Sequence, residues 1–432
     1  MNQLTVVSAR RRFVFLTALR WLPLGISIPV TVLLASSRGL SPADIGLAFV
    51  AHSVAALVLE LPTGGLADAI GRRPVLVLSA LLQIAGLLTL AVAQGLLGFV
   101  VAFALVGAGR ALDSGPLEAW YVDAVHLIDK DADVTPGLAR AGVAYGAGLA
   151  LGSVVGGLAP ILAANVGAGG NALVLPFLVA AALDIVYLVA VLALVVTLGP
   201  SSDRSPIRVL RLGVMEVPVI VRDTIGLAAR DRVLRQLLLI TFLIGTVLST
   251  LELLGPLRFA QLSDSRTEGT AVFGVVMAVS FSAAALGAGL ATPTRRAARG
   301  STALANTLAL GLCALAVTGV ALAPAVALAG VAYAFFYLFN GAGWPLRQQL
   351  MHSRVDAAHR STTVSANSMG LMIGAVTGSL LLPQLAEATS LTVALHAGAV
   401  PLVLAGIVAL RLRAATTTAP ATTGRQPAHA RG

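Results

Sequence analysis

The sequence has few charged residues for its length. Only 11% of its 432 residues are charged, whereas an ordinary soluble domain has about 25%. Hydrophobic residues make up 57%, and the mean hydropathy is +0.91. A surplus of this size cannot be enclosed in a soluble core, because part of it would have to face water. The composition therefore argues against a soluble enzyme or a DNA-binding protein and indicates an integral membrane protein.

Cysteine is almost absent, and no grouping of metal ligands stands out. The single cysteine, Cys313, lies in an apolar run and is interpreted as a packing residue. A lone cysteine excludes an internal disulfide and a zinc site built on cysteines. The six histidines are scattered, and the sequence has no phosphate-binding P-loop. We therefore expect no metal, no cofactor and no ATP hydrolysis in this chain.

Long apolar stretches make up most of the sequence. A helix needs about 20 mainly apolar residues to cross a bilayer. Twelve stretches meet this requirement, and they are 13–36, 43–64, 74–95, 97–124, 139–163, 172–198, 235–257, 269–291, 302–320, 323–346, 362–385 and 390–411. The predicted fold is an all-α membrane protein with twelve transmembrane helices in two six-helix halves.

The positive charges lie mainly on one side of the predicted membrane. Of the 29 Lys and Arg residues, 24 fall in loops on one side, Arg347 among them. Three lie on the opposite side (Arg38, Arg258 and Arg266), and Arg20 and Arg110 lie inside spans. Cytoplasmic loops carry such an excess, so both termini and the middle loop are expected in the cytoplasm. The basic pI of about 11.0 thus reports topology rather than nucleic-acid binding.

The spans suggest a duplicated chain. We expect an N-terminal half over 1–198, a cytoplasmic loop over 199–234, a C-terminal half over 235–411 and a disordered cytoplasmic tail over 412–432. Gly65-Leu66-Ala67 after the second span recurs as Gly289-Leu290-Ala291 after the eighth, 224 residues later. The central loop mixes apolar and arginine residues, which fits either a helix on the membrane surface or a solvated tether.

A short motif follows the second span. The stretch from Gly64 to Arg73 reads GGLADAIGRR, in which glycines allow a tight turn and the arginines anchor a loop at the cytoplasmic face. It resembles the signature G-x-L-A-D-R-x-G-R-K of the major facilitator superfamily. The resemblance implies that this element gates the inner side and that Asp68 helps to hold the outward-open state. Ala69 stands where the family has an arginine, so one salt bridge of that gate lacks its usual donor. The gating residues implied are Gly64, Leu66, Asp68, Gly71, Arg72 and Arg73.

The fifth span carries a second glycine motif. Gly148, Gly152, Gly156 and Gly157 resemble the antiporter motif G-x-x-x-G-P-x-x-G-G of the same superfamily, with Ser153 in place of the proline. This resemblance favours the twelve-helix drug/proton antiporter branch. Glycines four residues apart also allow helices to pack backbone to backbone, so a pure packing role is the alternative.

Charged residues inside the spans are the main functional candidates, because a charge at the bilayer centre costs about 2.5–3.5 kcal/mol. In the fourth span, Arg110, Asp113 and Ser114 share one helical face with Tyr121, and Glu118 lies beside it, which makes a polar stripe that faces a cavity. A carboxylate near an arginine can change its proton occupancy as a cavity becomes wet or dry. The proton-coupling candidates are Glu60, Arg110, Asp113 and Glu118, and the cavity candidates are Arg20, Tyr121, Asp184, Glu252 and Asn340.

A structural role is the alternative for these charges. Arg110 would then pair with Asp113 or Glu118, and Arg20 would pair with Glu60. Asp123 and Glu60 also lie near the cytoplasmic ends of their spans, so either could contact the Arg72-Arg73 turn.

The expected function is secondary active transport by alternating access. The resemblance favours proton-coupled efflux of small lipophilic or amphipathic organic compounds, such as drugs or secondary metabolites, with the proton gradient as the energy source. The alternative is an importer or facilitator of a small polar nutrient; an enzyme is not expected. The partners are a small-molecule substrate, protons and the lipid bilayer, without nucleic acid, and the chain is expected to act as a monomer in the cell membrane.

Overall fold

The structure is a computed structural model that describes residues 4–165, 172–197, 215, 222, 226, 231–352 and 360–416. At positions 61–65, 68, 352, 360–365 and 413–416 it describes the backbone alone. Most of the predicted central loop, and the tail beyond residue 416, lie outside the described residues.

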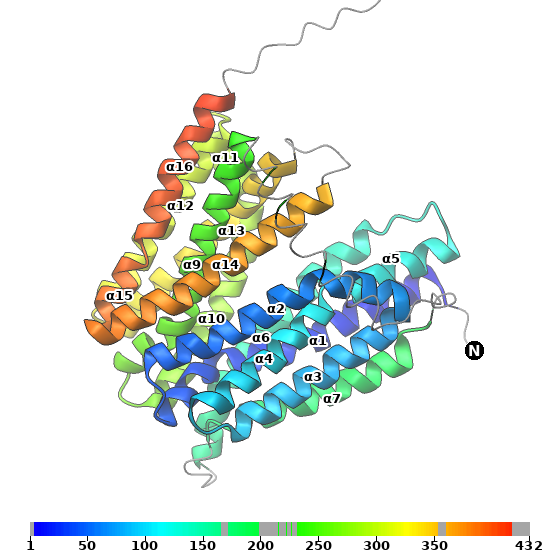
Figure 1. The fold of residues 1–432 in the computed structure, drawn as a ribbon, viewed down its shortest axis with the longest axis horizontal. Coiled ribbons are helices and arrows are strands. Elements are labelled where there is room, and N and C mark those ends of the chain that lie inside the picture. Colours follow the sequence, from blue (N-terminus) through cyan, green and yellow to red (C-terminus); the bar gives the residue numbers. More distant parts are fainter. Residues whose placement is uncertain are drawn as a thin grey trace, which may run out of the picture.

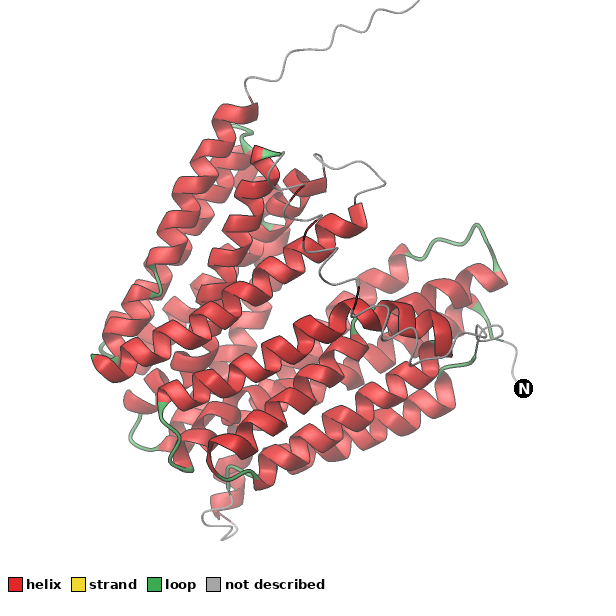
Figure 2. Ribbon diagram, viewed as in Figure 1, coloured by secondary structure: helices red, strands yellow, loops and turns green. Residues whose placement is uncertain are grey.

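All regular secondary structure in the described ranges is helical (Figure 2). The helices of the first half are α1 (Val6–Ser37), α2 (Pro42–Ile70), α3 (Arg72–Val92), α4 (Gly95–Asp113), α5 (Pro116–Ile128), α6 (Thr135–Asn165) and α7 (Leu175–Leu194). Those of the second half are α9 (Arg232–Gln261), α10 (Arg266–Gly289), α11 (Ala291–Ala297), α12 (Thr302–Leu322), α13 (Val326–His352), α14 (Arg360–Ala388), α15 (Leu391–Ala397) and α16 (Val400–Thr416).

Twelve segments of the described chain are long and apolar enough to cross a membrane, as predicted. The fourth comprises α4 and α5, and the twelfth comprises α15 and α16. The predicted ends need correction at the second span. Its helix continues through the glycine motif to Ile70, so the expected loop is reduced to the turn at Gly71. Helix α16 likewise continues to Thr416, five residues past the predicted boundary at 411.

The two halves repeat one pattern of helix contacts. In the first half α1 packs on α6 and α2 on α4, and in the second half α9 packs on α14 and α10 on α13. Two further pairs join the halves, namely α6 with α10 and α2 with α14. By the contacts within the halves, α6 corresponds to α14 and α10 to α2, so the two joining pairs are counterparts of each other. Two bundles related by an approximate two-fold axis have this arrangement.

The two bundles approach each other at one end and diverge at the other (Figure 1). The closely packed end includes the turn between α1 and α2. At the divergent end lie the last turns of α5 on one bundle and the first turns of α14 on the other.

Glycines set the closest helix contacts of α6. A Cβ atom on Gly152 would lie 2.4 Å from the carbonyl oxygen of Leu22, and one on Gly156 would lie 2.0 Å from that of Ile26, both on α1. Gly157 faces the other way, where its added Cβ would lie 2.9 Å from Cα of Gly274 on α10. The motif therefore packs backbones together both within the first half and between the halves.

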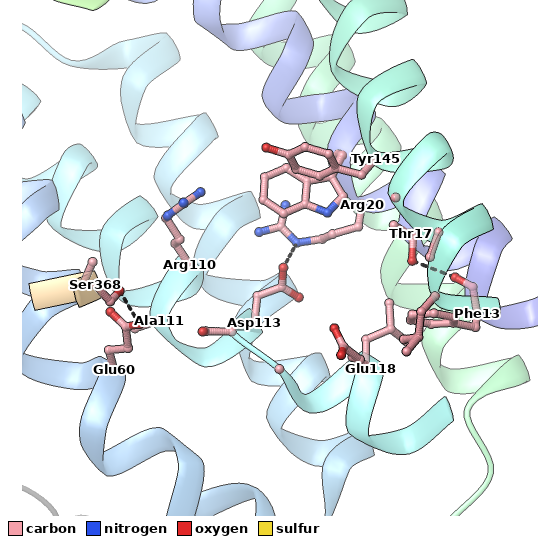
Figure 3. A pocket seen from close by; sticks show the side chains of 18 of the residues that line it. Phe13, Thr17, Arg20, Glu60, Arg110, Ala111, Asp113, Glu118, Tyr145 and Ser368 are labelled. Carbon is pink, nitrogen blue, oxygen red and sulfur yellow. Dashed lines mark hydrogen bonds and ion pairs between the residues drawn. The ribbon is translucent and has the colours of Figure 1, made fainter. Parts of the chain in front are cut away.

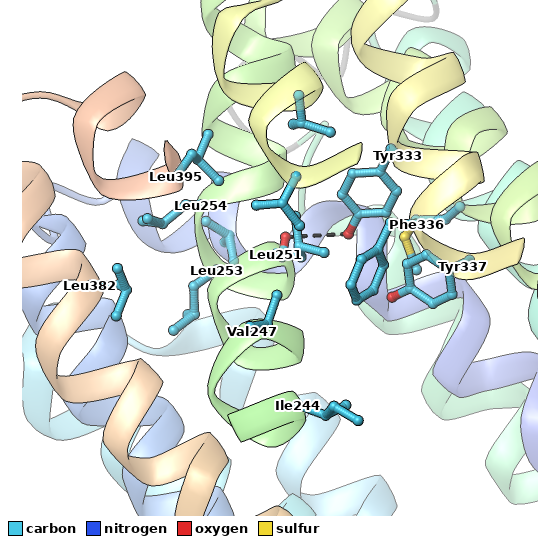
Figure 4. Packing of buried hydrophobic residues seen from close by; sticks show 14 of the residues in the cluster. Ile244, Val247, Leu251, Leu253, Leu254, Tyr333, Phe336, Tyr337, Leu382 and Leu395 are labelled. Atoms are coloured by element: carbon cyan, nitrogen blue, oxygen red, sulfur yellow. Dashed lines mark hydrogen bonds between the residues drawn. The ribbon is translucent and has the colours of Figure 1, made fainter. Parts of the chain in front are cut away.

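The second half has a continuous apolar core around α9 (Figure 4). Val247 and Leu251 of α9 are fully buried against Tyr333 and Phe336 of α13. The Tyr333 hydroxyl donates a hydrogen bond to the carbonyl oxygen of Leu251 at 3.3 Å. Cys313 is a free thiol buried in the same cluster, as its packing interpretation predicted.

Substitution of Gly156 by alanine is expected to destabilise the protein. The new methyl group would overlap the Ile26 carbonyl, so α1 and α6 would have to separate, at a cost of about 1–3 kcal/mol. Gly146→Ala on the same helix is the matched control, because its Cβ would meet nothing within 4 Å and alanine favours the helix. The measurement is thermal unfolding in detergent micelles. Equal unfolding temperatures for the two variants would contradict the close packing.

Candidate functional site

The fourth span is broken in the middle, which corrects the prediction of one continuous helix over 97–124. Helix α4 ends at Asp113, Gly115 takes a left-handed conformation with φ of 100°, and Pro116 begins α5. Glycine tolerates this conformation and proline suits the first turn of a helix, so the Ser-Gly-Pro sequence places the break. The side chains before and after it no longer follow one helical face.

Tyr121 is displaced from the predicted polar face by this break. Its ring stacks on Phe13 with centroids 4.6 Å apart, and its hydroxyl donates to the carbonyl oxygen of Val134 at 3.3 Å. The side chain is 1% exposed within an apolar cluster. Tyr121 is therefore a core residue rather than a cavity residue.

A cavity of about 530 Å³ lies beside the break (Figure 3). This volume is within the range of small-molecule sites. Helices α1, α2, α4, α5 and α6 of the first half form most of its wall, and α14 adds Ser368 and Met372 from the second half. The charged side chains that line it are Arg20, Glu60, Arg110, Asp113 and Glu118. We call Glu60, Asp113 and Glu118 the wall carboxylates.

Arg20 pairs with Asp113, and not with Glu60 as the structural alternative predicted. Arg20 Nε lies 2.9 Å from Asp113 Oδ2, and the two side chains are only 5% and 11% exposed. Gln83 of α3, with its amide oriented to suit its neighbours, accepts a hydrogen bond from Arg20 Nη2 at 2.9 Å. The pairing differs from the prediction because Asp113, the last residue of α4, reaches Arg20, whereas Glu60 bonds to Ser368 of the second half.

Arg110 faces the open side of the cavity. Its guanidinium carbon lies 5.8 Å from the ring centre of Trp21, which packs edge-to-face on Tyr145. Its charge acts on Glu252, an exposed side chain of α9 in the second half. Arg110 was predicted to pair with Asp113 or Glu118. It instead contacts the ring of Trp21 and interacts electrostatically with Glu252 of the second half.

Glu60 connects the two halves. Its Oε1 accepts a hydrogen bond from the Ser368 hydroxyl at 3.0 Å, so α2 is joined to α14 at the cavity (Figure 3). Any relative movement of the bundles at this level has to break or remake this bond.

The gating motif forms a tight turn with an ion pair. Gly71 has φ of 90° between α2 and α3, a conformation that favours glycine. Arg72 pairs with Asp123 at 3.1 Å, as one of the predicted alternatives had it, and Arg73 donates to the carbonyl oxygen of Leu192 on α7. Leu66 is buried at the end of α2. The side chain of Asp68 and the surroundings of Gly64 lie outside the described residues.

Asp184 of α7 does not line the cavity. It is 1% exposed and lies behind the cavity wall, where its charge interacts with Arg20 and Asp113. The prediction of an isolated cavity residue is wrong here, because α7 packs on α1 and buries the carboxylate against that ion pair.

Asn340 also takes a different role from the one predicted. Its Oδ1 accepts a hydrogen bond from Arg347 Nη2 at 3.0 Å, and Arg347 Nη1 donates to Asn306 at 3.2 Å. Arg347 is 6% exposed, so its assignment to a cytoplasmic loop is wrong. Helix α13 simply runs past the predicted end at residue 346.

The matching family covers residues 13–339, and its description is Major Facilitator Superfamily. The chain belongs to the Major Facilitator Superfamily. It is therefore a membrane transporter of that superfamily, with its twelve helices in two halves. No curated protein matches the sequence.

Solved structures of other transporters are similar to this chain in fold. The nucleoside transporter NupG has a TM-score of 0.74 at 13% identity, over 96% of this chain and 99% of that chain. The human organic anion transporter MFSD10 (TETRAN) has 0.60 at 17%, over 94% and 100%. A structure on substrate recognition in proton dependent oligopeptide transporters has 0.69 at 14%, over 95% and 99%. At these identities the similarity extends to the fold alone.

The sequence analysis did not identify Gln83 and Arg347 as buried polar residues of this transporter. Gln83 is 6% exposed, and an amide inside an apolar span was a usable signal because a buried amide needs partners. Arg347 directly follows the predicted end of its span at residue 346, whereas α13 continues to His352.

Removal of Arg20 is expected to destabilise the first half strongly. Arg20→Gln leaves Asp113 buried without its cation, at a cost of about 3–5 kcal/mol. Asp123→Asn is the control, because the Arg72–Asp123 pair is half exposed and such pairs contribute about 0–1 kcal/mol. Unfolding in a denaturing detergent measures both. A loss for Arg20→Gln no larger than that for Asp123→Asn would contradict a buried ion pair.

Proposed function

We propose that this chain is a proton-coupled secondary transporter that exports small amphipathic organic compounds, with a preference for positively charged ones. The observation that carries this proposal is the charge of the cavity wall. Three carboxylates and two guanidinium groups line it, and one guanidinium, that of Arg20, is already paired with Asp113. The field of Glu252 adds a further negative charge from the second half.

Size and surface chemistry support an amphipathic ligand. The cavity of about 530 Å³ accommodates a drug-sized molecule. Trp21, Tyr145 and Met372 offer apolar contacts beside the wall carboxylates. An organic cation could place its apolar body on these side chains and its charge near Glu118 or Glu60.

Alternating access suits the arrangement of the halves. The bundles diverge at the end where α5 finishes and α14 begins (Figure 1). We place the arginine-rich loops and both termini on the cytoplasmic side of the cell membrane. With this orientation the cavity opens toward the cytoplasm, which corresponds to an inward-open state.

Proton coupling is the proposed energy source. The wall carboxylates line the open cavity and lose contact with water when the halves close. In the proposed cycle, this change in hydration drives the binding and release of protons. Arg110 lies among them and modulates that affinity through its charge.

Import of a polar nutrient is the second candidate. It is favoured by the solved structures of similar fold, whose names describe nucleoside and proton dependent oligopeptide transporters. The direction of proton-driven movement separates the two candidates.

Transport assays are expected to show export that depends on a proton gradient. Cells with this chain should accumulate less tetraphenylphosphonium than cells without it, and an uncoupler should abolish the difference. In vesicles, Glu60→Gln, Asp113→Asn or Glu118→Gln should reduce gradient-driven transport, because each removes a group that can bind a proton or the cation. The reduction expected is at least tenfold for one of the three.

The control variant is Asp264→Asn, an exposed carboxylate in the turn between α9 and α10. Unchanged dependence on the proton gradient in all three wall variants would reject the coupling role. Substrate entry down its own gradient regardless of pH would favour the importer.

Thiol labelling is expected to identify the open side. Gly142 lines the cavity and an added side chain there meets nothing within 4 Å, so Gly142→Cys in a Cys313→Ala background is a conservative probe. A membrane-impermeant maleimide should label it in inside-out vesicles and label it at least fivefold less in right-side-out vesicles. The reverse preference would contradict the inward-open assignment.

A further inference from the structure

A buried charged cluster lies behind the cavity wall, where α1, α4 and α7 each contribute a side chain. Arg20 of α1 lies 2.9 Å from Asp113 of α4. The charges of Asp184 and Asp113 both act on Arg20, and so does Tyr187, one turn after Asp184 on α7. Only Asp113 and Arg20 of this cluster reach the cavity.

The cluster has more carboxylates than cations. Asp184 is 1% exposed, Arg20 5% and Tyr187 0%. One guanidinium therefore faces two buried carboxylates, which leaves one negative charge unbalanced if both are ionised. An unbalanced buried charge inside a membrane protein is costly, and binding a proton removes that cost.

Unsatisfied polar atoms point to the same place. Among the described residues, neither Oδ1 of Asp184 nor the hydroxyl of Tyr187 has a hydrogen-bond partner, and both atoms are fully enclosed. Oδ1 of Asp113 is also without one. Nε of Arg20 is likewise without a well-directed hydrogen bond, so both donors and acceptors of the cluster are under-satisfied. A proton held on one carboxyl would remove the charge from that group and allow it to donate to the other.

Other charged groups of the surrounding helices do not balance this excess. Helix α7 packs on α1, α3 and α6. The side chain of α3 that contacts the cluster is the neutral Gln83. The remaining ionisable side chains of these three helices lie elsewhere: Arg10, Arg11 and Arg12 at the start of α1, Arg72 and Arg73 at the start of α3, the exposed Arg140 of α6, and Tyr145 against Trp21.

Arg110 is the other cation at this depth, one turn before Asp113 on α4. It is exposed on the cavity side, stacks over Trp21, and acts electrostatically on Glu252 and Tyr145. It forms no ion pair with Asp113 or Asp184 among the described contacts.

We propose that Asp113 and Asp184 together hold one proton around Arg20, and that this cluster is the proton-binding site of the transporter. The proposal deepens the proposed function and rests on it for the role in transport. Asp184 is the inner member of the site and Asp113 is the member in contact with the cavity.

The site couples the proton to a cationic substrate by exchange of charge. When an organic cation approaches Asp113, Arg20 turns toward Asp184, and the shared proton leaves to a water molecule in the cavity. One carboxyl O–H bond breaks and one O–H bond forms on water, which becomes hydronium. The site loses one positive charge with the proton and regains it with the bound cation, so its total charge is the same before and after the exchange. Arg20 moves between two partners and acts as a positioning residue.

The test is an infrared titration of the purified protein in detergent, followed through the band of protonated carboxyl groups, with no substrate present. The wild type and the Asp264→Asn control should show this band at neutral pH. Asp184→Asn should lose the part that the site contributes. Asp113→Asn should lose the same part, because one carboxylate then faces one guanidinium. Arg20→Gln should increase the band, because both carboxyls then hold a proton.

Proton-driven transport of tetraphenylphosphonium in proteoliposomes provides the second measurement. Asp184→Asn should reduce accumulation driven by the proton gradient at least tenfold and should keep exchange of labelled for unlabelled substrate. Asp184→Glu should restore part of the accumulation, since it returns a carboxyl to α7.

The outcomes separate the two proposals. An infrared band unchanged in both Asp184→Asn and Asp113→Asn overturns the assigned site, even if wild-type transport depends on the proton gradient. If the band changes as expected in the variants but wild-type transport does not depend on the proton gradient, the proton site stands and proton-coupled transport is rejected.

Discussion

The first half of the molecule is organised around one guanidinium group that has to be neutralised inside the membrane. Arg20 is 5% exposed, and three other helices supply the polar groups around it. Asp113 comes from α4, Gln83 from α3 and Asp184 from α7, while α1 carries Arg20 itself. Because a charge in this environment is expensive to leave unpaired, these helices cannot shift independently of one another.

The second half has corresponding helix packing but lacks this charged cluster. Gly109 of α4 lies against Gln83 of α3, and Gly343 of α13 lies against Asn306 of α12, so both halves place a buried amide beside a glycine. In the second half, however, the guanidinium belongs to α13 itself, as Arg347, and its described partners are neutral amides. Close glycine contacts therefore preserve the duplicated packing, while the ionisable chemistry of the cavity has become concentrated in one half.

The contact between halves follows from both features. Gly157 and Gly274 bring α6 and α10 together with nothing between their backbones, which suits a pivot. Glu60 and Ser368 join α2 to α14 by a polar bond at the cavity, which suits a contact that is made and broken. The cavity thus lies where the wall carboxylates and the joint between the halves meet.

Much of the site could be predicted as a set of residues and little of it as a set of contacts. Charges inside apolar spans identified Arg20, Glu60, Arg110, Asp113 and Glu118, all of which line one cavity. The pairs expected for Arg20 and Arg110 differ from those observed, whereas the contact of Arg72 with Asp123 agrees with one predicted alternative. A sequence states how deep a side chain lies and does not state which helix it faces. Tyr121 was misplaced because a single left-handed glycine rotates everything after it.

By itself the sequence determined that the chain crosses a membrane twelve times in two related halves, because span length and hydropathy are local properties of the residues. It also placed a turn after the second span, where Gly71 adopts a conformation that favours glycine. Only the tertiary structure decided that Arg20 binds Asp113, that Asp184 lies behind the wall and that Arg347 is buried. Each of these depends on which helix faces rotate toward one another, and that is settled by packing over the whole bundle.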